Sequence, residues 1–521
     1  MSNNNLLSGR VNRQYIGGRY IPKFYQNSED GSTLWEANVV YEPLVYVTLA
    51  NGNMYLSKKQ VPAIIGSPAA NMEYWLFVSS YNGYIERLQE EINNIIETLE
   101  TAENNIEDIQ TSLTYTFANV MDYGAKADGT TDDREAFVNA LATGKPVYAP
   151  EGTYRISSAI TVNAGVHVFG DGQGKTILKF DNQTDPQKYL FQNYTEASKQ
   201  GAIFRDFTID VNTYEQDPKK FHGGIFLQAF TDILIDNIEV YHTSEGGNAV
   251  TLWGCSRGTV SNCFMHHLYG TGIYVCESSS KINIVNNKVI DSIVTSGCID
   301  CWQSNNIVIE GNYVESQNNL TFGMNIDTCR QLIIANNNCN ASNTGIAVFS
   351  SSEMTIIGNR CRNSSFAGIE LQKNTSGNPC SIITIADNDC LYNGEFGIVD
   401  SSESQFTKIH NNRIGETQKH GIYCVNNSLC DIKGNTVRNS GLSTANTFAD
   451  IYIAGTGQYP SINDNVMYSA NAAANVYTES GVGGVMCNNN NCLATGGTYN
   501  INIVGTASAI VENNRGTTNI A

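Results

Sequence analysis

Three carboxylic acids fall at matched positions in the second half of the chain. When the strands that follow successive Gly–apolar pairs are aligned, two columns emerge: Tyr274, Asp300, Asn325, Ala347 and Glu370, and, two residues later, Cys276, Trp302, Asp327, Phe349 and Gln372. Residues two apart on a strand point to the same side, and the residues at one aligned position stack from coil to coil. We therefore expect Asp300, Asp327 and Glu370 to share one outward surface.

This surface has the residue types needed to cleave glycosidic bonds. Such cleavage uses two carboxyl groups about 5 Å apart for retention or about 6.5–9.5 Å apart for inversion. Asp300 and Asp327, one coil and two positions apart, would place their Cα atoms roughly 8 Å from each other. We predict Asp300, Asp327 and Glu370 as catalytic residues. The predicted substrate-binding residues are Trp302, Asn325 and Phe349, whose rings and amide would contact a sugar.

A bland interpretation of the same column stays open, because outward positions of any soluble β-structure are polar. A lyase would also need a basic proton acceptor, and only the proximity of Arg330 to Asp327 in the sequence supports one. No cofactor and no protein metal site are predicted, and a divalent cation at the carboxylates is the open alternative.

Two other segments carry candidate chemistry. Tyr241, His266 and Asp291 recur at 25-residue spacing, with His242 and His267 beside them, and a histidine held by a carboxylate can act as a general base. The segment 208–224, TIDVNTYEQDPKKFHGG, would form a loop in which Lys219, Lys220 and His222 offer positive charge to phosphate or uronate groups. The alternatives are surface contacts for the first and a solvated loop for the second.

A repeat of about 25 residues must position these side chains. Its main landmark is asparagine, at Asn237, Asn262, Asn287, Asn312, Asn337, Asn359, Asn388, Asn412, Asn435, Asn465, Asn490 and Asn514. Short β-branched runs bounded by Asn, Ser and Gly, at such a period, are typical of a solenoid. Asparagine tolerates left-handed backbone angles, and amides stacked about 4.8 Å apart can bond as a ladder. The sequence thus predicts a parallel β-helix whose bends carry these asparagines.

An inward column accompanies the asparagines. Two positions after them lie Val289, Val314, Cys339, Cys361, Cys390, Ile414, Val437 and Met467. All 14 cysteines lie after position 254, and no C-x-x-C pair occurs. We expect reduced, buried thiols rather than disulfides or zinc ligands.

Two regions precede the repeats. Residues 1–83 are rich in aromatic and strand-forming residues and predict a small β-module, whose rings would either fill its core or stack on sugars. In residues 84–115 apolar side chains alternate at spacings of 3 and 4, at Ile85, Leu88, Ile92, Ile95, Leu99, Ala102, Ile106, Ile109 and Leu113. This pattern predicts a coiled coil, and isoleucine at both seam positions favours a trimer. Residues 116–521 form the predicted β-helix.

Composition excludes several partners. The net charge of −19 argues against nucleic acid, and no apolar run is long enough for a membrane span. The first residues, MSNNNLLSGRVNRQ, lack the apolar core of a secretory signal peptide. The charge also disfavours a polyanionic glycan as the ligand, unless basic residues or bound cations help locally.

Three ordered motifs resemble a known family. VMDYGAKADGTTDDREAFVNAL, VYAPEGTYRI and VHVFGDGQGKTIL are similar to the entry of pectate-lyase-like right-handed β-helix proteins, with DREAFVNAL as a capping helix. YIGGRYIPKFY, VVYEPLVYVTLANGNMYLSKKQVP and IIGSPAANMEYW resemble the N-terminal module of pre-neck appendage proteins from small podoviruses of Gram-positive hosts. The resemblance implies a trimeric phage spike, synthesised in the host cytoplasm and attached through residues 1–83 to neck or tail proteins. It also implies that the β-helix binds, and in some members cleaves, teichoic acid or surface polysaccharide.

Three functions follow from this. The leading prediction is a virion appendage that recognises and cleaves a cell-wall glycopolymer. Its rivals are a purely adhesive spike and a free polysaccharide lyase or hydrolase. Turnover of host polymer, compared with an Asp300→Ala/Asp327→Ala variant, separates the first two.

Overall fold

The structure, a computed structural model, divides into two compact units, Met1–Tyr115 and Thr116–Ala521. It describes residues 34–51, 53–80, 117–181, 188–212, 221–293, 296–316, 322–340, 342–505 and 508–521, with the backbone alone at 15–16, 19–20, 23–24, 79–80 and 494–495. The predicted coiled coil over 84–115 lies outside the described residues, so it stays a prediction, as does the trimer.

A four-stranded sheet builds the described part of the first unit. Its strands are β3 (Lys23–Phe24), β4 (Val45–Thr48), β5 (Asn53–Ser57) and β6 (Trp75–Ser80); β1 (Tyr15–Ile16) pairs with β2 (Arg19–Tyr20), and a 3-10 turn, η1, covers Pro68–Ala70. Tyr41 and Trp75 are buried, with ring centroids 5.3 Å apart. These two aromatic residues therefore fill the core of the unit.

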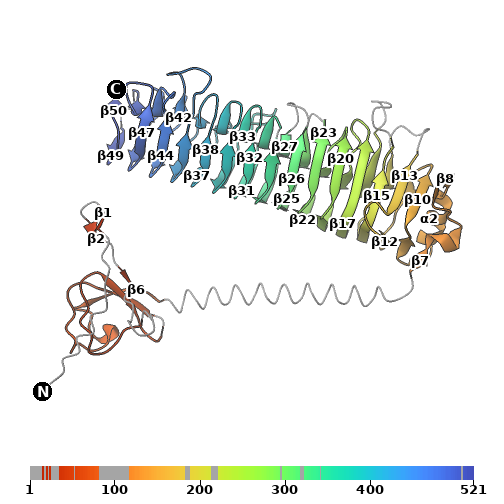
Figure 1. The fold of residues 1–521 in the computed structure, drawn as a ribbon, viewed down its shortest axis with the longest axis horizontal. Coiled ribbons are helices and arrows are strands. Elements are labelled where there is room, and N and C mark those ends of the chain that lie inside the picture. The colour runs from red at the N-terminus through yellow and green to blue at the C-terminus, as the bar shows by residue number, and fades with distance from the viewer. Residues whose placement is uncertain are drawn as a thin grey trace. The chain divides into compact units, whose positions relative to one another are not determined.

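The second unit is a parallel β-solenoid of about 15 turns with three faces (Figure 1). Face 1 is a 15-stranded sheet of β11 (Ile160–Thr161), β14 (Tyr189–Asn193), β16 (Gly223–Gln228), β18 (Val250–Trp253), β21 (Ile273–Cys276), β24 (Gly297–Trp302), β27 (Phe322–Asp327), β30 (Thr344–Phe349), β33 (Ala367–Gln372), β36 (Phe396–Asp400), β39 (Ile422–Val425), β42 (Ala449–Ala454), β45 (Ala474–Thr478), β48 (Ile501–Ile503) and β50 (Thr518–Ile520).

The other two faces belong to one 29-stranded sheet. Face 2 contains β7 (Ala118–Asn119), β9 (Val147–Ala149), β12 (Val166–Gly170), β19 (Ser256–Ser261), β22 (Ser280–Val285), β25 (Asn305–Glu310), β28 (Arg330–Ala335), β31 (Ser352–Ile357), β34 (Ser381–Ala386), β37 (Lys408–His410), β40 (Asp431–Lys433), β43 (Ser461–Asn463), β46 (Met486–Asn488) and β49 (Ile510–Glu512). Face 3 contains β8 (Asp128–Asp132), β10 (Gly152–Ile156), β13 (Thr176–Phe180), β20 (Phe264–Leu268), β23 (Lys288–Ser292), β26 (Tyr313–Ser316), β29 (Asn338–Asn340), β32 (Arg360–Arg362), β35 (Asp389–Leu391), β38 (Arg413–Gly415), β41 (Thr436–Arg438), β44 (Val466–Ser469) and β47 (Asn491–Thr495). Two long strands, β15 (Lys199–Asp210) and β17 (Phe230–Thr243), run through both faces and join them.

Two consecutive residues form the bend between faces 2 and 3, and each has its own structural role. The first has a left-handed backbone, as at Asn286 (φ 56°) and Gly311 (φ 67°). The second is a buried asparagine of the ladder. Nδ2 of Asn312, for example, donates to Oδ1 of Asn337 at 2.9 Å and to the carbonyl oxygen of Ile284 at 2.8 Å. The left-handed backbone and the ladder hydrogen bonds, which we expected of one asparagine, therefore belong to two neighbouring residues.

The predicted ladder is confirmed from Asn287 onward. Its rungs are Asn287, Asn312, Asn337, Asn359, Asn388, Asn412, Asn435, Asn465, Asn490 and Asn514. Asn237 and Asn262 were wrong as rungs, because they hold the left-handed first position with φ 50° and 54°. Ser261 pairs with Val285, so Cys263 lies opposite Asn287, and its backbone N–H donates to the Asn287 amide at 3.0 Å.

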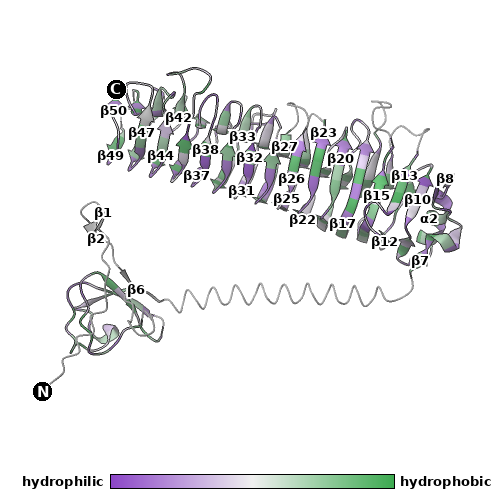
Figure 2. Ribbon diagram, viewed as in Figure 1, coloured by the Kyte–Doolittle hydropathy of each residue, from purple (hydrophilic) through white to green (hydrophobic). Residues whose placement is uncertain are grey.

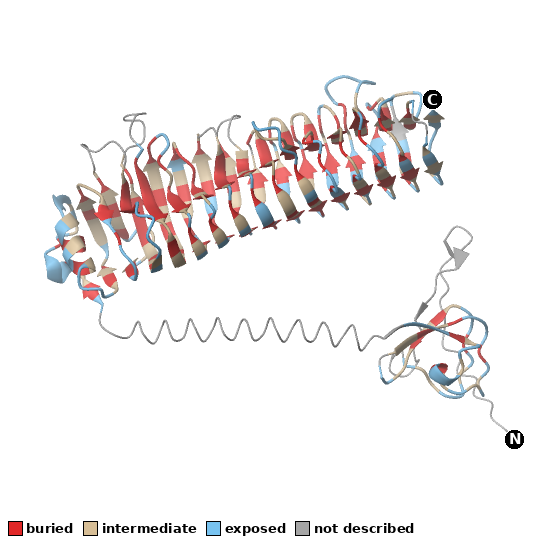
Figure 3. Ribbon diagram, turned by 180° about the vertical axis from the view of Figure 1, so that it is seen from behind, coloured by how far each residue is buried: buried red, intermediate tan, exposed pale blue. Residues whose placement is uncertain are grey.

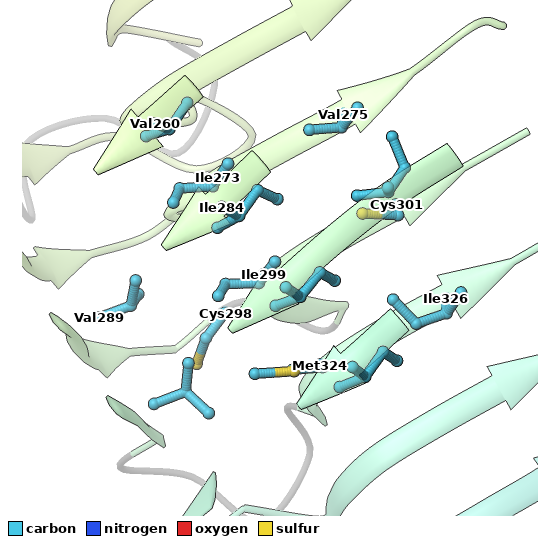
Figure 4. Close-up of a cluster of buried hydrophobic side chains, with 14 of the residues drawn as sticks. Val260, Ile273, Val275, Ile284, Val289, Cys298, Ile299, Cys301, Met324 and Ile326 are labelled. Atoms are coloured by element: carbon cyan, nitrogen blue, oxygen red, sulfur yellow. The ribbon is translucent and has the colours of Figure 1, made fainter. Parts of the chain in front are cut away.

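The interior is a continuous apolar core. The predicted inward column from Val289 to Met467 is fully buried, and all 14 cysteines are buried and free, as expected. Figure 4 shows Cys298 and Met324 packed among valine and isoleucine side chains of successive coils. Hydrophobic and hydrophilic residues alternate along the strands (Figure 2), and buried positions follow the solenoid over its length (Figure 3).

A short helix, α2 (Arg134–Leu141), packs on the first coils together with a 3-10 turn, η2 (Val120–Tyr123). Its Ala136, Phe137 and Ala140 side chains are buried in the solenoid core. The ring of Phe137 meets that of Tyr154 edge-on at 5.4 Å. The helix thus covers apolar residues at the N-terminal end of the solenoid, which is the cap predicted from DREAFVNAL.

Candidate active site on face 1

The predicted outward register on face 1 is confirmed. Asp300 pairs with Asn325 and Trp302 with Asp327 between β24 and β27, while Asp327 pairs with Phe349 between β27 and β30. Asp300 and Asp327 therefore lie on adjacent coils, two positions apart along the strand. This arrangement agrees with the Cα separation of roughly 8 Å expected from strand geometry.

Asp300 is a nearly buried carboxyl group, with only 6% of the residue exposed. Nδ2 of Asn325 donates to its Oδ1 at 3.2 Å, and Ser296 and the backbone N–H of Gly297 also bond to it. Burial outweighs these hydrogen bonds and, together with the nearby Asp327 charge, raises the pKa of Asp300 to about 6. The group is therefore suited to donate a proton near neutral pH.

Asp327 has a different environment at the end of β27. It is half-buried, and the Thr328 hydroxyl donates to its Oδ1 at 2.8 Å. In register, the half-buried rings of Trp302 and Phe349 occupy the same position one coil before and one coil after. An aromatic residue thus flanks this carboxylate along the axis on either side, which suits a sugar ring held over it.

Glu370 does not join the pair. It lies on β33, three coils beyond Asp300, which is roughly 14 Å along the axis at the usual strand spacing. Burial raises its pKa, while Gln372 and the hydroxyl of Thr344, 3.0 Å from Oε2, hydrogen-bond to it. Two rungs, Asn325 and Ala347, separate Glu370 from Asp300, so Glu370 does not adjoin the Asp300–Asp327 pair, and its catalytic role stays a prediction.

An aromatic stack continues the same outward column toward the C-terminus. Tyr423, Tyr452 and Tyr477 are in register on β39, β42 and β45. The rings of Tyr452 and Tyr477 lie 5.0 Å apart at 14°, and those of Phe396 and Tyr423 lie 5.4 Å apart at 10°. This stack was not predicted, although the three tyrosines occupy, on later coils, the same column position as Asp300.

The basic loop is only partly described. Lys219 and Lys220 lie outside the described residues, so their predicted contact with substrate stays a prediction. His222 is fully buried, with its ring 5.6 Å from that of Phe180. The expectation that His222 offers surface charge to a polymer is therefore wrong, because the residue enters the core just before β16.

The histidine column on face 3 has a different partner from the predicted one. Tyr241 stacks on His266 at 5.1 Å as expected, but Leu268 pairs with Ser292, which puts Asp291 opposite His267. The carboxylate that holds His266 is Glu239, whose Oε1 lies 3.1 Å from Nε2, and this hydrogen bond lowers the pKa of Glu239. A change in coil length at the bend, invisible to simple spacing, moved Asp291 by one position.

Two negative findings apply to the described ranges only. No group of three or more His, Cys, Asp or Glu side chains within them is placed to hold a metal ion. None of the helices described there has the length and apolarity needed to cross a membrane.

Comparisons with known proteins agree with the architecture. Residues 117–370 match the family described as rhamnogalacturonase A/epimerase, pectate lyase-like. The pre-neck appendage protein of Bacillus phage phi29 is 28% identical over 205 residues, and that of Bacillus phage PZA is 26% identical over 205 residues. The homologues of this chain include phage pre-neck appendage proteins. Each of these alignments covers 34% of this chain and 23% of the relative.

Two other similarities are to an enzyme and to a solved phage structure. Mannuronan C5-epimerase AlgE4 of Azotobacter vinelandii is 32% identical over 148 residues, covering 25% of this chain and 27% of the enzyme. Among solved structures, the N-terminal fragment of bacteriophage phi29 gene product 12 superposes with a TM-score of 0.59 at 16% identity, over 81% of this chain and 75% of that fragment. The predicted resemblance to a phage appendage with a right-handed-type parallel β-helix is confirmed.

Proposed function

We propose that this protein is a virion appendage of a phage that adsorbs to the bacterial surface by binding and cleaving a cell-wall glycopolymer, either teichoic acid or surface polysaccharide. The observation that carries the proposal is the Asp300–Asp327 pair on face 1, where a buried carboxyl with raised pKa lies one coil from a more open carboxylate between two aromatic residues. The pre-neck appendage homologues support the virion role.

In the proposed mechanism the two carboxyl groups have separate tasks. Asp300 donates its proton to the leaving-group oxygen, which its pKa of about 6 permits near neutral pH. Asp327 takes the opposite role, as base for an attacking water at an inverting separation or as nucleophile at a retaining one. Trp302 and Phe349 hold the sugar by stacking, and the Asn325 amide fixes the Asp300 carboxyl.

The remaining partners belong to the same proposal. Residues 1–83 attach the protein to the phage neck or tail, and residues 84–115 hold three copies together. The scheme uses no cofactor. A divalent cation that bridges a carboxylate and an anionic polymer is the alternative for a negatively charged substrate.

Turnover of host polymer tests the proposal. The purified protein is incubated with wall teichoic acid and with capsular polysaccharide, beside Asp300→Ala/Asp327→Ala, and reducing ends and released phosphate are measured. Product that disappears in the variant supports cleavage at this pair. Product that persists in a folded variant moves the reaction elsewhere on the solenoid.

A non-catalytic receptor-binding spike is the second candidate. The small exposed fraction of Asp300, 6%, favours it, because a substrate oxygen must reach that carboxyl. Binding of a host polymer without product from any of them identifies the spike as an adhesin.

A further inference from the structure

Face 3 carries a group of arginines on an otherwise acidic chain. Arg360 and Arg362 lie on β32, Arg413 on β38 and Arg438 on β41, with Asp389 between them on β35. Arg360 pairs in register with Asp389, and Asp389 pairs with Arg413. Asp389 therefore lies in register between two of the four arginines.

The ion pairs do not neutralise this group. Nη2 of Arg362 contacts Oδ2 of Asp389, and Arg413 reaches the same carboxylate with Nη2 at 2.9 Å and Nε at 3.4 Å. Nε of Arg362 is buried and has no hydrogen-bond partner among the described residues, within which Arg360 also makes no ion pair. Three positive charges thus share one negative charge in a protein whose net charge is −19.

The fourth arginine has a weak partner. Nε of Arg438 lies 3.9 Å from Oε1 of Glu416, and that oxygen already accepts from Nδ2 of Asn439 at 2.8 Å. The side chains of Arg413 and Arg438 are 54% and 46% exposed. These two guanidinium groups therefore retain unoccupied donors that face solvent.

Two exposed tyrosines lie among the arginines. Tyr392, which directly follows β35, is 53% exposed, and Tyr468, in register with Arg438, is 51% exposed. No stacking partner of either ring occurs in the described part of the chain, in contrast to the tyrosines of face 1. We call Arg360, Arg362, Tyr392, Arg413, Arg438 and Tyr468 the arginine patch.

We propose that the arginine patch is a second polymer-binding site, one that takes the phosphate or carboxylate groups of an anionic glycopolymer. Guanidinium groups bind both anions through paired N–H donors, and exposed tyrosine faces bind sugar or polyol carbons. From β32 to β41 the patch spans three coil steps, roughly 14 Å, which accommodates more than one charged unit of an extended chain. The inference builds on the proposed polymer-binding function but uses a face that lacks Asp300.

Binding of defined polymers measures the patch directly. The purified protein is titrated with polyphosphate, with polygalacturonate and with neutral dextran by calorimetry. We expect Arg360→Gln/Arg438→Gln to bind each polyanion that the wild type binds about tenfold more weakly, with a shallower dependence on salt and no change toward dextran. If the protein binds polyphosphate but not polygalacturonate, the arginine patch prefers phosphate groups. The reverse result indicates a preference for uronate carboxylates.

Asp389→Asn gives the opposite and sharper test. Removing this carboxylate releases two guanidinium groups, so the variant should bind the same polyanion several-fold more tightly. A purely structural role for Asp389 predicts no gain. The matched controls are Arg257→Gln/Arg330→Gln, which changes the net charge as much as Arg360→Gln/Arg438→Gln does, and Asp232→Asn, which changes it as much as Asp389→Asn does. Their residues form the Arg330–Glu353 and Arg257–Asp232 pairs on face 2.

Two results would overturn the inference. One is polyanion affinity that responds equally to the patch and control substitutions, which would indicate net charge alone. The other is unchanged affinity together with an altered oligomeric state in sedimentation, which would make the patch a contact between copies. Cleavage lost in the Asp300→Ala/Asp327→Ala variant is independent of both results, so failure here leaves the function of face 1 standing.

Discussion

The outward column of face 1 has two halves with opposite character. In the first half successive coils contribute Tyr274, Asp300, Asn325, Ala347 and Glu370, with no residue type repeated in adjacent rungs. In the second half Tyr423, Tyr452 and Tyr477 follow one another, and their rings lie against each other. Both halves have the same backbone, so the difference comes from the side chains alone.

Repetition along the axis directs side chains toward their own neighbours. A tyrosine whose faces are covered by the rings above and below stabilises coil stacking and has little face left for a ligand. The asparagine ladder follows the same rule, since each amide binds the next. Where adjacent rungs differ, as at Asp300, Asn325 and Asp327, polar groups remain for chemistry. Repeated rungs therefore support the solenoid, and unrepeated rungs are the better candidates for function.

The strongest test of this contrast is turnover. We expect Asp300→Asn to lower kcat by about 10²–10⁴-fold, because it removes the proton donor. Glu370→Gln, three coils away, should keep most of the activity. Steady-state kinetics on the polymer that the wild type cleaves would decide it, and equal losses in both variants would return Glu370 to the catalytic centre.

The pH profile should report the same residue. With the pKa of Asp300 raised to about 6, the protonated acid is lost as pH rises, so the acid-dependent limb of kcat/KM should fall tenfold per unit above about pH 6. Rates measured between pH 5 and pH 9 would show this limb. A flat profile across that range would argue against Asp300 as the acid.

A second buried carboxyl group, Asp450, shows what a raised pKa does to stability at a position outside the candidate active site. It is fully buried on β42, where Asn475 donates to Oδ2 at 2.6 Å, and burial raises its pKa to about 7. Because the folded state favours the neutral carboxyl, this group contributes its full stabilisation only below the pKa that it has in the unfolded chain. That contribution is lost as the pH rises through its folded pKa of about 7. Asp450→Asn should therefore raise the free energy of unfolding at pH 8 by about 2–4 kcal/mol, with little effect at pH 4.

Denaturant unfolding of wild type and Asp450→Asn at both pH values measures that difference. Activity should be unchanged, because Asp450 has no exposed surface from which to reach a polymer. A variant that is destabilised equally at both pH values would show that the carboxylate is needed for its hydrogen bonds with Ser469 and Asn475.

Two neighbouring asparagines at one bend test whether the ladder position and the left-handed position contribute differently to stability. Asn412→Ala removes a rung: the backbone N–H and Nδ2 of Asn388 lose the acceptor Oδ1 of Asn412, and the carbonyl oxygen of Ile385 loses the donor Nδ2, at a cost of about 3 kcal/mol. Asn411→Gly, at the left-handed first position (φ 56°), should change stability by less than about 1 kcal/mol. Urea unfolding of the two variants gives the comparison, and similar losses would contradict it.

The smallest expected effect concerns the tyrosine stack. Tyr477→Leu removes one ring that covers Tyr452 at 5.0 Å, and should lower the free energy of unfolding by about 1 kcal/mol without altering polymer cleavage. Thermal unfolding and turnover, measured together, would check both statements. A loss of polymer affinity instead would show that the stacked rings still offer a binding surface.

Much of the architecture was predictable because each coil repeats the same local pattern of inward, outward and bend residues. The outward register from Tyr274 to Glu370 and the inward column from Val289 to Met467 follow from period-two strands aligned at a glycine. Asn237 and Asn262 misled because the bend uses a pair of residues, and a single recurring asparagine does not tell the first position from the second. The preceding residue was a partial signal: each rung follows Asn, Asp or Gly, whereas Asn262 follows Ser261, but Asn237 also follows an aspartate, Asp236.

The candidate site was predictable only in part. Sequence spacing determined that Asp300 and Asp327 share a surface, since coils of similar length stack in register. It could not determine that Asp300 is nearly buried with a raised pKa, that His222 enters the core, or that Glu239 rather than Asp291 holds His266. These outcomes depend on desolvation and on contacts between coils about 25 residues apart, which exist only once the chain is wound.

The sequence by itself determined the solenoid: the period of the repeat, the inward stack, the buried thiols and the positions that face outward. Only the tertiary structure decided which outward side chains meet, and so where charge gathers. Arg360 and Arg413 lie 53 positions apart in the chain yet flank one carboxylate on successive coils of face 3. The reason is physical, because periodicity fixes the direction of a side chain, whereas its charge environment is summed over neighbours that only winding brings together.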